Sequence, residues 1–206
     1  DIKTGDLRSS YDVIILPHDQ SDRMTGTPKA RPGRPAPVYP PEYRSALDDD
    51  GLEALKAFVA SGGTLVALGG ATEFAIDKFD LKIWNVISDL PTDEFFCPGS
   101  TVKASFDNSH PLAYGMPDDG LVLFWGSPTF QIEPSQHNEW YETIVRFGDR
   151  DLLQSGWLIG EKHIAEKAGM VVAKQGKGRV ILIGFRTQNR SQTHGTFKLL
   201  FNTLLR

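Results

Sequence analysis

The chain has 206 residues, of which 40% are hydrophobic and 23% charged, a composition typical of a globular protein with one substantial domain. A formal net charge of −4 and a pI of about 5.7 argue against nucleic acid as a partner, and no apolar run approaches the ~20 residues that cross a membrane. The single cysteine, Cys97, excludes an internal disulfide and a zinc site built from several thiolates.

The N-terminal quarter of the chain predicts one buried strand followed by a long loop. The strand covers residues 11–16, and Pro17 ends it. Residues 17–45 contain seven prolines, which excludes a helix or a central strand and predicts a partly polyproline-like loop. Such a loop wraps the surface, is disordered or carries function. Because the chain begins with Asp1 rather than methionine, we expect targeting information upstream.

Residues 48–68 predict a helix and a second strand. Three aspartates from Asp48 supply an N-cap and favourable charge for a helix over residues 51–61, and Gly62 and Gly63 end it. The apolar run 64–68 then predicts a buried strand. Strand, helix and strand at this spacing indicate a parallel βαβ crossover.

The remainder of the chain is rich in expected strands. We predict them over residues 101–106, 121–125, 143–147, 152–159, 170–173 and 180–185, with a hairpin turn at 175–178 and a final amphipathic helix from Phe197. We interpret residues 1–206 as a single α/β domain in which 99–160 form a β-rich insertion or extension.

The turn Gly69-Gly70, directly after the strand 64–68, is the first candidate site. Ligands and catalytic groups collect at the carboxyl ends of strands in open α/β sheets. A nucleophile elbow would need Ser or Cys there, and neither is present. The glycines match no dinucleotide or P-loop fingerprint, so we expect no cofactor. The turn is either purely structural or holds an anion through backbone N–H groups.

The loop after the strand 180–185 is the densest group of polar residues. Arg186 and Arg190 could clamp a carboxylate or a phosphate, with Gln188 and His194 beside them. Such side chains also tie loops to backbone carbonyls, so this ligand site is a hypothesis.

Cysteine, histidine and aromatic residues leave three further alternatives open. Cys97 is either a buried inert thiol or, paired with His110, a nucleophile. The five histidines form no H-x-x-E or H-x-x-x-H pair, so we expect no metal, with a scattered site at His18 and Asp19 as the alternative. Four aromatic residues supply either core packing or sugar-stacking surfaces: Trp125, Trp140, Tyr141 and Trp157.

The segment "YDVIILP" and the βαβ unit after it resemble the class I glutamine amidotransferase-like superfamily. The resemblance implies a flavodoxin-like, mostly parallel sheet, with an antiparallel extension here and a first strand and helix upstream of Asp1. It places the nucleophilic cysteine of that superfamily at Gly69. It also places the catalytic His and Glu in the loop that starts at Arg186, where the sequence has no His-x-Glu. Both catalytic elements are therefore missing.

A narrower resemblance covers nearly the whole chain. The segments "YPPEYRSALDDDGLEALKAFVASGGTLVAL", "EFFCPGS", "HPLAYGMP", "SGWLIGE" and "GFRTQNRSQTHGTFKLLFNTLL" are similar to the C-terminal region of large bacterial zinc carboxypeptidase (carboxypeptidase A-like) proteins. The resemblance implies a peptidase domain in the same polypeptide and a periplasmic or extracellular location. No catalytic residue and no zinc motif carries over.

Together these observations predict a non-catalytic accessory domain of an exported zinc carboxypeptidase-like protein. Its expected ligand is small and anionic, or a peptide, at Gly69, Gly70, Arg186, Gln188, Arg190 and His194. Two alternatives remain: a stand-alone hydrolase of the amidotransferase-like superfamily that uses Cys97 or a His/Asp pair, and a carbohydrate- or cell-wall-binding module.

Overall fold

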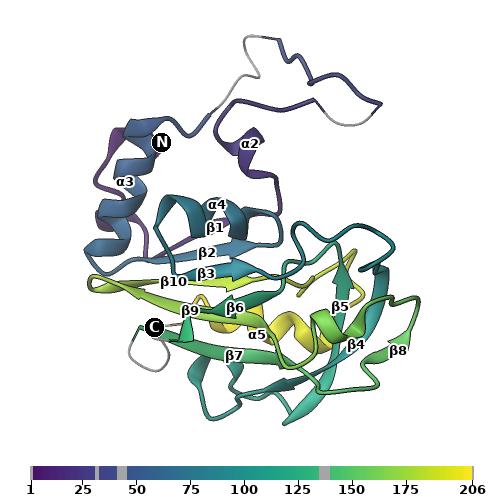
Figure 1. The fold of residues 1–206 in the computed structure, drawn as a ribbon. Helices are drawn as coiled ribbons and strands as arrows, with labels where there is room; N and C mark the ends of the chain where they lie inside the picture. The colour runs from purple at the N-terminus through teal and green to yellow at the C-terminus, as the bar shows by residue number, and fades with distance from the viewer. Residues whose placement is uncertain (1, 31–32, 41–45, 135–139, 206) are drawn as a thin grey trace.

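A computed structural model describes residues 2–30, 33–40, 46–134 and 140–205. In these ranges a curled, mixed sheet of ten strands forms the centre of the molecule (Figure 1). Its main path runs in the order β1 (Val13–Leu16), β2 (Thr64–Leu68), β10 (Gly178–Ile183), β9 (Ala168–Gln175), β7 (Tyr141–Phe147), β4 (Pro98–Phe106) and β5 (Asp119–Trp125). Off this path, β3 (Ile83–Asn85) pairs with β6 (Phe130–Ile132), β6 also pairs with β9, and β8 (Leu153–Ser155) pairs with β4.

The described helices are short apart from α3. They are α1 (Leu7–Ser10), α2 (Ser21–Met24), α3 (Asp49–Ala60), α4 (Ala71–Lys78) and α5 (Phe197–Asn202), with single 3-10 turns at Ile2–Thr4, Pro111–Ala113, Glu161–His163 and His194–Thr196. None of these helices is long and apolar enough to cross a bilayer.

The expected βαβ crossover is confirmed. Strands β1 and β2 are parallel, with Val13 opposite Thr64, and α3 connects them. The Asp48 side chain accepts a hydrogen bond from the Gly51 backbone N–H at 3.2 Å and so caps the helix as predicted. Strand β10 lies parallel to the other side of β2.

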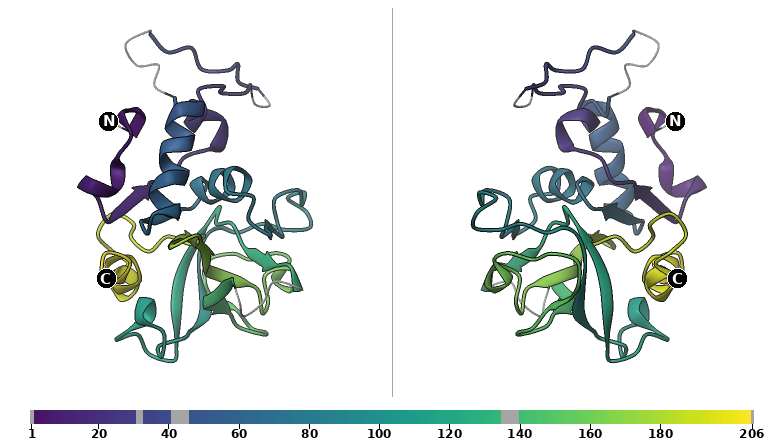
Figure 2. Two further views of the ribbon diagram at one scale, coloured as in Figure 1. Left: turned by 90° about the vertical axis from the view of Figure 1, so that its left-hand side faces the viewer. Right: turned by 90° about the vertical axis from the view of Figure 1, so that its right-hand side faces the viewer.

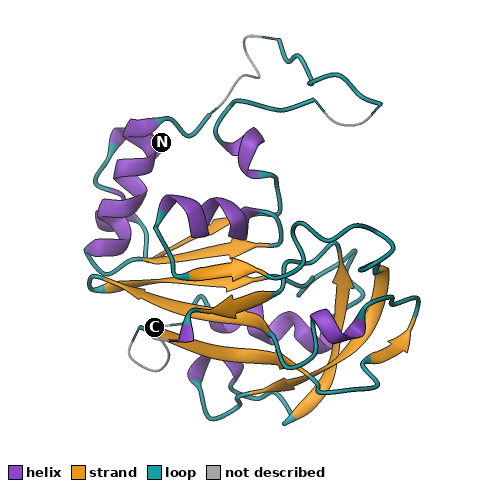
Figure 3. Cartoon of the chain, viewed as in Figure 1, coloured by secondary structure: helices purple, strands orange, loops and turns teal. Residues whose placement is uncertain are grey.

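The expected α/β class is also confirmed, but the sheet is mixed rather than mostly parallel. Among the described strands only the pairs β1–β2 and β2–β10 are parallel, whereas β9, β7, β4 and β5 pair antiparallel. The reason is connection length. A two-residue turn joins β9 to β10 at Gly176, where φ is +61°, and such a turn can link only antiparallel strands. Figure 3 shows that β4, β5, β7 and β8 lie in the half of the molecule away from α3, whereas β1, β2 and β10 lie beside it.

Three local expectations are corrected by the structure. Helix α2 lies inside the proline-rich stretch, because residues 18–27 contain no proline and suffice for one helical turn. The expected strand 152–159 is reduced to Leu153–Ser155, since the backbone at Gly156 has φ +103° and leaves the extended conformation. Strands β3 and β6 were not expected, because each is only three residues long and shows no readable alternation.

Two apolar cores lie on opposite faces of the sheet. Alternate residues of β2 point to opposite sides, so that Leu65 and Ala67 join the core under α3 and α4, while Val66 joins the core that includes Leu199 of α5. Figures 1 and 2 show the same arrangement, with α3 and α4 above β10 and α5 below it. Burial on both faces explains why the sequences of β2 and β10 read as continuous apolar runs.

Candidate functional site

A cleft of about 700 Å³ opens where β1 and β2 end. We call it the edge cleft and define it by five of its lining residues: His18, Gly70, Glu73, Asn85 and Cys97. They come from the segment after β1, the turn after β2, α4, β3 and the segment before β4. The fold therefore brings chemically useful side chains from distant parts of the sequence to the carboxyl end of the parallel strands.

The Gly69-Gly70 turn forms one wall of the edge cleft, and both positions require glycine. Gly69 has φ +52°, and a Cβ there would overlap Nδ1 of His18. A Cβ at Gly70 would lie 2.5 Å from the backbone oxygen of Asp19. The His18 imidazole therefore occupies the space in which a side chain at position 69 would begin.

His18 is held in one tautomer by the turn. Its Nδ1 accepts a hydrogen bond from the Gly70 backbone N–H at 2.9 Å, so in the neutral ring the proton resides on Nε2. Burial lowers the pKa of His18, the charge of Arg186 lowers it further, and Asp19 acts in the opposite direction. His18 is therefore a neutral N–H donor near pH 7.

Glu73, in the first turn of α4, is positioned by Asn85. The Asn85 side-chain amide donates to Oε1 of Glu73 at 2.7 Å, while its Oδ1 accepts from the backbone N–H of Thr129 at 3.0 Å and of Ile87 at 3.3 Å. One amide thus connects α4, β3 and the start of β6. It holds a carboxylate in the cleft that could accept a hydrogen bond from a ligand.

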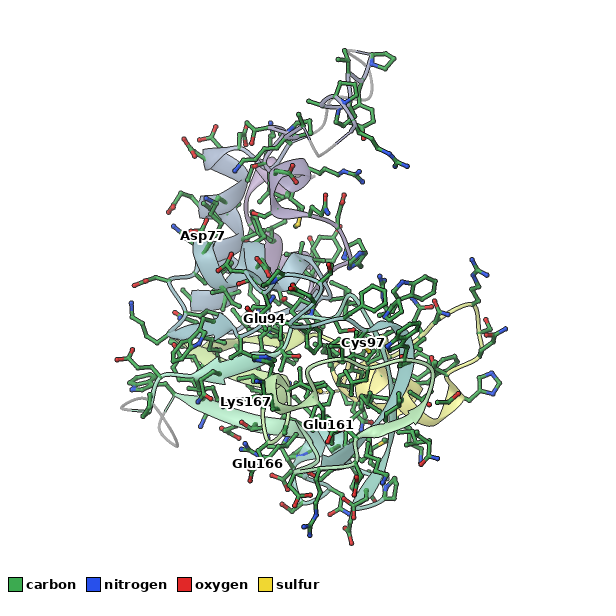
Figure 4. All side chains as sticks on the ribbon, turned by 45° about the vertical axis from the view of Figure 1, so that its right-hand side comes forward. Asp77, Glu94, Cys97, Glu161, Glu166 and Lys167 are labelled. Carbon is green, nitrogen blue, oxygen red and sulfur yellow. The ribbon has the colours of Figure 1, made fainter. Side chains whose placement is uncertain are left out.

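Cys97 lines the same cleft as a buried thiol. Figure 4 shows it in the middle of the molecule, among other side chains, and its Sγ lies 3.9 Å from the backbone oxygen of Phe124. Burial raises the pKa of the Cys97 thiol, and hydrogen bonds from Ser100 and Gly99 offset this only in part. His110 does not approach it, because its Nε2 lies 3.1 Å from Glu142 and its Nδ1 accepts from the Leu112 N–H at 3.1 Å. The environment favours thiol over thiolate.

The four residues expected to form a site after β10 lie in different settings. Arg186 is half-buried beside His18, and burial lowers its pKa. In the described ranges no carboxylate pairs with it. Gln188 and Arg190 are exposed. His194 instead lines a second groove, of about 650 Å³, against β4 and β5. Of the six residues expected to form one ligand site, Gly70 lines the edge cleft, His194 lines the second groove, and the charge of Arg186 acts on His18.

The four aromatic candidates also differ in their settings. Tyr141 is buried, and its hydroxyl accepts the Lys82 backbone N–H at 2.8 Å, so it belongs to the core. The other three are about half exposed or more: Trp125 at 46%, Trp140 at 50% and Trp157 at 62%. Trp157 packs edge-on against Phe96, Trp140 lines a cleft at the other end of the parallel strands, and Trp125 lines the groove with His194.

Sequence reasoning missed the two interactions that organise the edge cleft. It did not link His18 to the Gly70 turn, and it did not single out Glu73 or Asn85. A signal was present for His18, which follows Pro17 at the carboxyl end of a buried strand. No signal was available for Asn85, since its role depends on strand β3. No three His, Cys, Asp or Glu side chains of the described ranges are grouped so as to hold a metal ion.

Comparison with known proteins gives a likeness of fold. No family model and no curated protein matches the chain. A cytoplasmic protein from Salmonella typhimurium is 15% identical, with a TM-score of 0.57 over 98% of this chain and 76% of that one. A ThuA-like protein from Bacteroides uniformis is 14% identical, with a TM-score of 0.50 over 100% and 73%. A beta-galactosidase from Rahnella is 17% identical, with a TM-score of 0.51 over 96% of this chain but only 23% of that one.

Proposed function

We propose that this chain is a non-catalytic accessory domain, of the flavodoxin-like, amidotransferase-like fold, whose edge cleft binds a small ligand with a carboxylate group. The observation that carries the proposal is the geometry at Gly69. His18 fills the place of a nucleophile, and its ring accepts the N–H of Gly70. A domain that retains the strand, turn and helix but not the attacking atom is suited to binding rather than to acyl chemistry.

Arg186, whose charge acts on His18, supports a carboxylate ligand, whereas the lining itself carries Asp22, Glu73 and Asp89 against Lys29. Arg186 is half-buried, beside His18, with no paired carboxylate among the described residues. A guanidinium in this state binds a carboxylate in a bidentate manner, and the Nε2–H of His18 can donate a further hydrogen bond. Glu73 supplies an acceptor for the amide or ammonium group that accompanies the carboxylate in a peptide or amino acid. These features favour a peptide end over inorganic phosphate.

The sequence resemblance to the C-terminal region of zinc carboxypeptidase-like proteins supports the wider context of the proposal. A peptidase domain of the same polypeptide would be the partner, the location would be periplasmic or extracellular, and this domain would help to hold the substrate. Sequencing the coding region upstream of Asp1 tests this context. A domain with His-x-x-Glu and a later His supports it, and a short leader followed by this domain alone contradicts it.

A pair of matched peptides tests the ligand. A tripeptide with a free C-terminal carboxylate should bind at least tenfold more tightly than the same tripeptide with a C-terminal amide, as measured by calorimetry. Arg186→Gln should abolish the difference, whereas Arg190→Gln, which removes the same charge from an exposed site, should preserve it. Equal binding of both peptides by the unchanged chain contradicts the proposal, as does turnover of glutamine or peptide by this chain alone.

The alternative of a Cys97-dependent hydrolase rests on one specific observation, that Cys97 and His18 line the same cleft. Its test is the reactivity of the thiol. Because burial raises the pKa of Cys97, we expect the folded chain to react with a thiol reagent at pH 7 at least tenfold more slowly than after unfolding. Rapid labelling of the folded chain, together with turnover that Cys97→Ala abolishes, would favour the hydrolase.

A further inference from the structure

A second groove, of about 650 Å³, lies against the outer face of β4 and β5 and has a chemistry different from that of the edge cleft. We call it the β5 groove and define it by Leu121, Trp125, Asn189, Gln192 and His194. Alternation along β5 sends Val122 and Phe124 into the core, so that Leu121 and Trp125 remain about half exposed on the opposite face. The loop after β10 forms the other wall, anchored where the Arg186 N–H donates to Leu123 O at 3.0 Å.

The lining of the β5 groove contains no Asp, Glu, Lys or Arg among the described residues, although such residues make up 23% of the chain. Its polar groups are side-chain amides, threonine hydroxyls and one imidazole, and the rest of the lining is apolar. A groove of this kind provides no charge for a phosphate, a carboxylate or a cation. It suits a ligand that is uncharged and carries many hydroxyl groups.

Trp125 provides a platform for such a ligand. Its indole ring lies beside Gly99, at a distance where an added Cβ would be in van der Waals contact with three ring atoms at 3.7 to 3.9 Å, and 46% of the residue remains exposed. Gly99 itself has φ +129°, a conformation that favours glycine. One side of the ring therefore faces Gly99, and about half of the residue is exposed, as it must be for an aromatic residue to pack against the apolar face of a sugar ring.

The loop opposite Trp125 is shaped to present its amides. Arg190 and Ser191 adopt left-handed φ values of +49° and +56°, two consecutive non-glycine residues in a conformation that is costly and concentrates at functional sites. Asn189 and Gln192 lie on either side of this strained pair. Amide side chains donate and accept together, which matches the hydroxyl groups of a sugar.

Internal hydrogen bonds fix the same loop. Thr193 and Thr196 both donate to the backbone oxygen of Thr187, at 3.1 and 2.8 Å, and His194 packs edge-on against Phe197 at 5.1 Å between ring centroids. The wall of the groove is thus built before any ligand arrives, which lowers the entropic cost of binding.

We propose that the β5 groove binds a neutral oligosaccharide, with one sugar ring packed against Trp125 and its hydroxyl groups bonded to Asn189 and Gln192. This site is independent of the carboxylate site proposed for the edge cleft, because none of the residues that define the edge cleft lines the groove.

Calorimetric titration with a panel of neutral trisaccharides tests the inference, with glucose, galactose and N-acetylglucosamine units as the probes. We expect saturable binding of at least one of them, a tenfold or larger loss in Trp125→Ala, and a smaller loss in Gln192→Ala. Trp140→Ala is the matched control, since Trp140 is exposed to a similar degree but lines a different cleft, and it should leave binding unchanged. Circular dichroism verifies that each variant is folded.

Three outcomes would overturn the inference: no saturable binding by any member of the panel, undiminished binding in Trp125→Ala and Gln192→Ala, or competition by an apolar peptide that binds more tightly in a Trp125-dependent manner. Arg186→Gln separates the two sites. It should leave sugar binding intact while it abolishes the preference for a peptide carboxylate, so either proposal can fail without the other.

Discussion

The edge cleft and the β5 groove lie on the same sheet but are built differently. The edge cleft lies where parallel strands end, and loops with charged and titratable side chains meet there: His18, Glu73 and the neighbouring Arg186. The β5 groove lies on a strand face, where alternation exposes every second side chain and the lining is uncharged. Strand direction thus determines which kind of surface each half of the sheet presents, since parallel strands bring loop ends together and antiparallel strands can leave one face open.

The largest expected effect tests the rigid wall of the edge cleft. Gly70→Ala would place a Cβ 2.5 Å from the Asp19 backbone oxygen, which cannot move as a flexible side chain could. We expect the free energy of unfolding to fall by about 2–3 kcal/mol. For a chain of this length each kcal/mol lowers the melting temperature by roughly 2–4 °C, which a thermal scan measures.

Gly195→Ala, beside the β5 groove, is the matched control for this change. A Cβ at Gly195 would meet no atom within 4 Å, and its φ is not positive, so the melting temperature should change little. Equal effects at the two glycines would mean that the edge cleft is no more constrained than the groove.

A smaller effect is expected from Asn85→Ala, which removes the amide connecting three elements at the edge cleft. The buried Thr129 N–H would lose its acceptor, at a cost of about 1–2 kcal/mol in the free energy of unfolding by chemical denaturation. Asn85→Asp keeps the acceptor but places a second carboxylate beside Glu73, so Glu73→Gln should restore much of the stability in that background. A lack of rescue would show that the bond to Glu73 contributes little.

The pH dependence of stability distinguishes the titratable cleft from the uncharged groove. The pKa of His18 is lowered in the folded state, chiefly by burial and also by Arg186, so the unfolded state binds more protons below the ordinary value of about 6.5. The contribution of His18 to the free energy of unfolding is complete above about pH 6.5. It is lost as the pH falls through the lower pKa that His18 has in the folded state. Protonation would also abolish the acceptor that Nδ1 offers to Gly70.

Denaturation curves measured from pH 7 to pH 5 check this sign. The unchanged chain should lose stability with decreasing pH, and His18→Gln should give a flatter profile. His194→Gln, at the β5 groove, serves as the comparison. An unchanged slope in His18→Gln would remove His18 as the titrating group of the cleft.

The smallest effect is expected at the opposite end of the parallel strands, where the charges already have partners. Glu142 lies 2.6 Å from Lys174 and 3.1 Å from His110, and Lys174 in particular lowers the pKa of Glu142. Because the pair is partly exposed, Glu142→Gln should cost less than about 1 kcal/mol near pH 7 in the same denaturation assay. A loss larger than that of Asn85→Ala would show that the dominant polar network lies at this end.

The sequence by itself determined the elements whose signal is local. The apolar runs of β2 and β10, the Asp48 cap of α3 and the turn at Gly176 were readable because propensity, capping and turn conformation depend on neighbouring residues. The Gly69-Gly70 turn was recognised for the same reason, and the absence of Ser and Cys at these two positions was read directly from the sequence.

Only the tertiary structure decided which residues share a site. His18 and Gly70 are 52 positions apart, Asn85 and Thr129 are 44 apart, and neither hydrogen bond has a local signature. The loop after β10 read as one polar site, yet His194 lines the β5 groove while the charge of Arg186 acts on His18. The physical reason is strand pairing. The antiparallel pairing of β9, β7, β4 and β5 beyond β10 depends on side-chain packing on both faces of the sheet, and no short segment of the sequence encodes it.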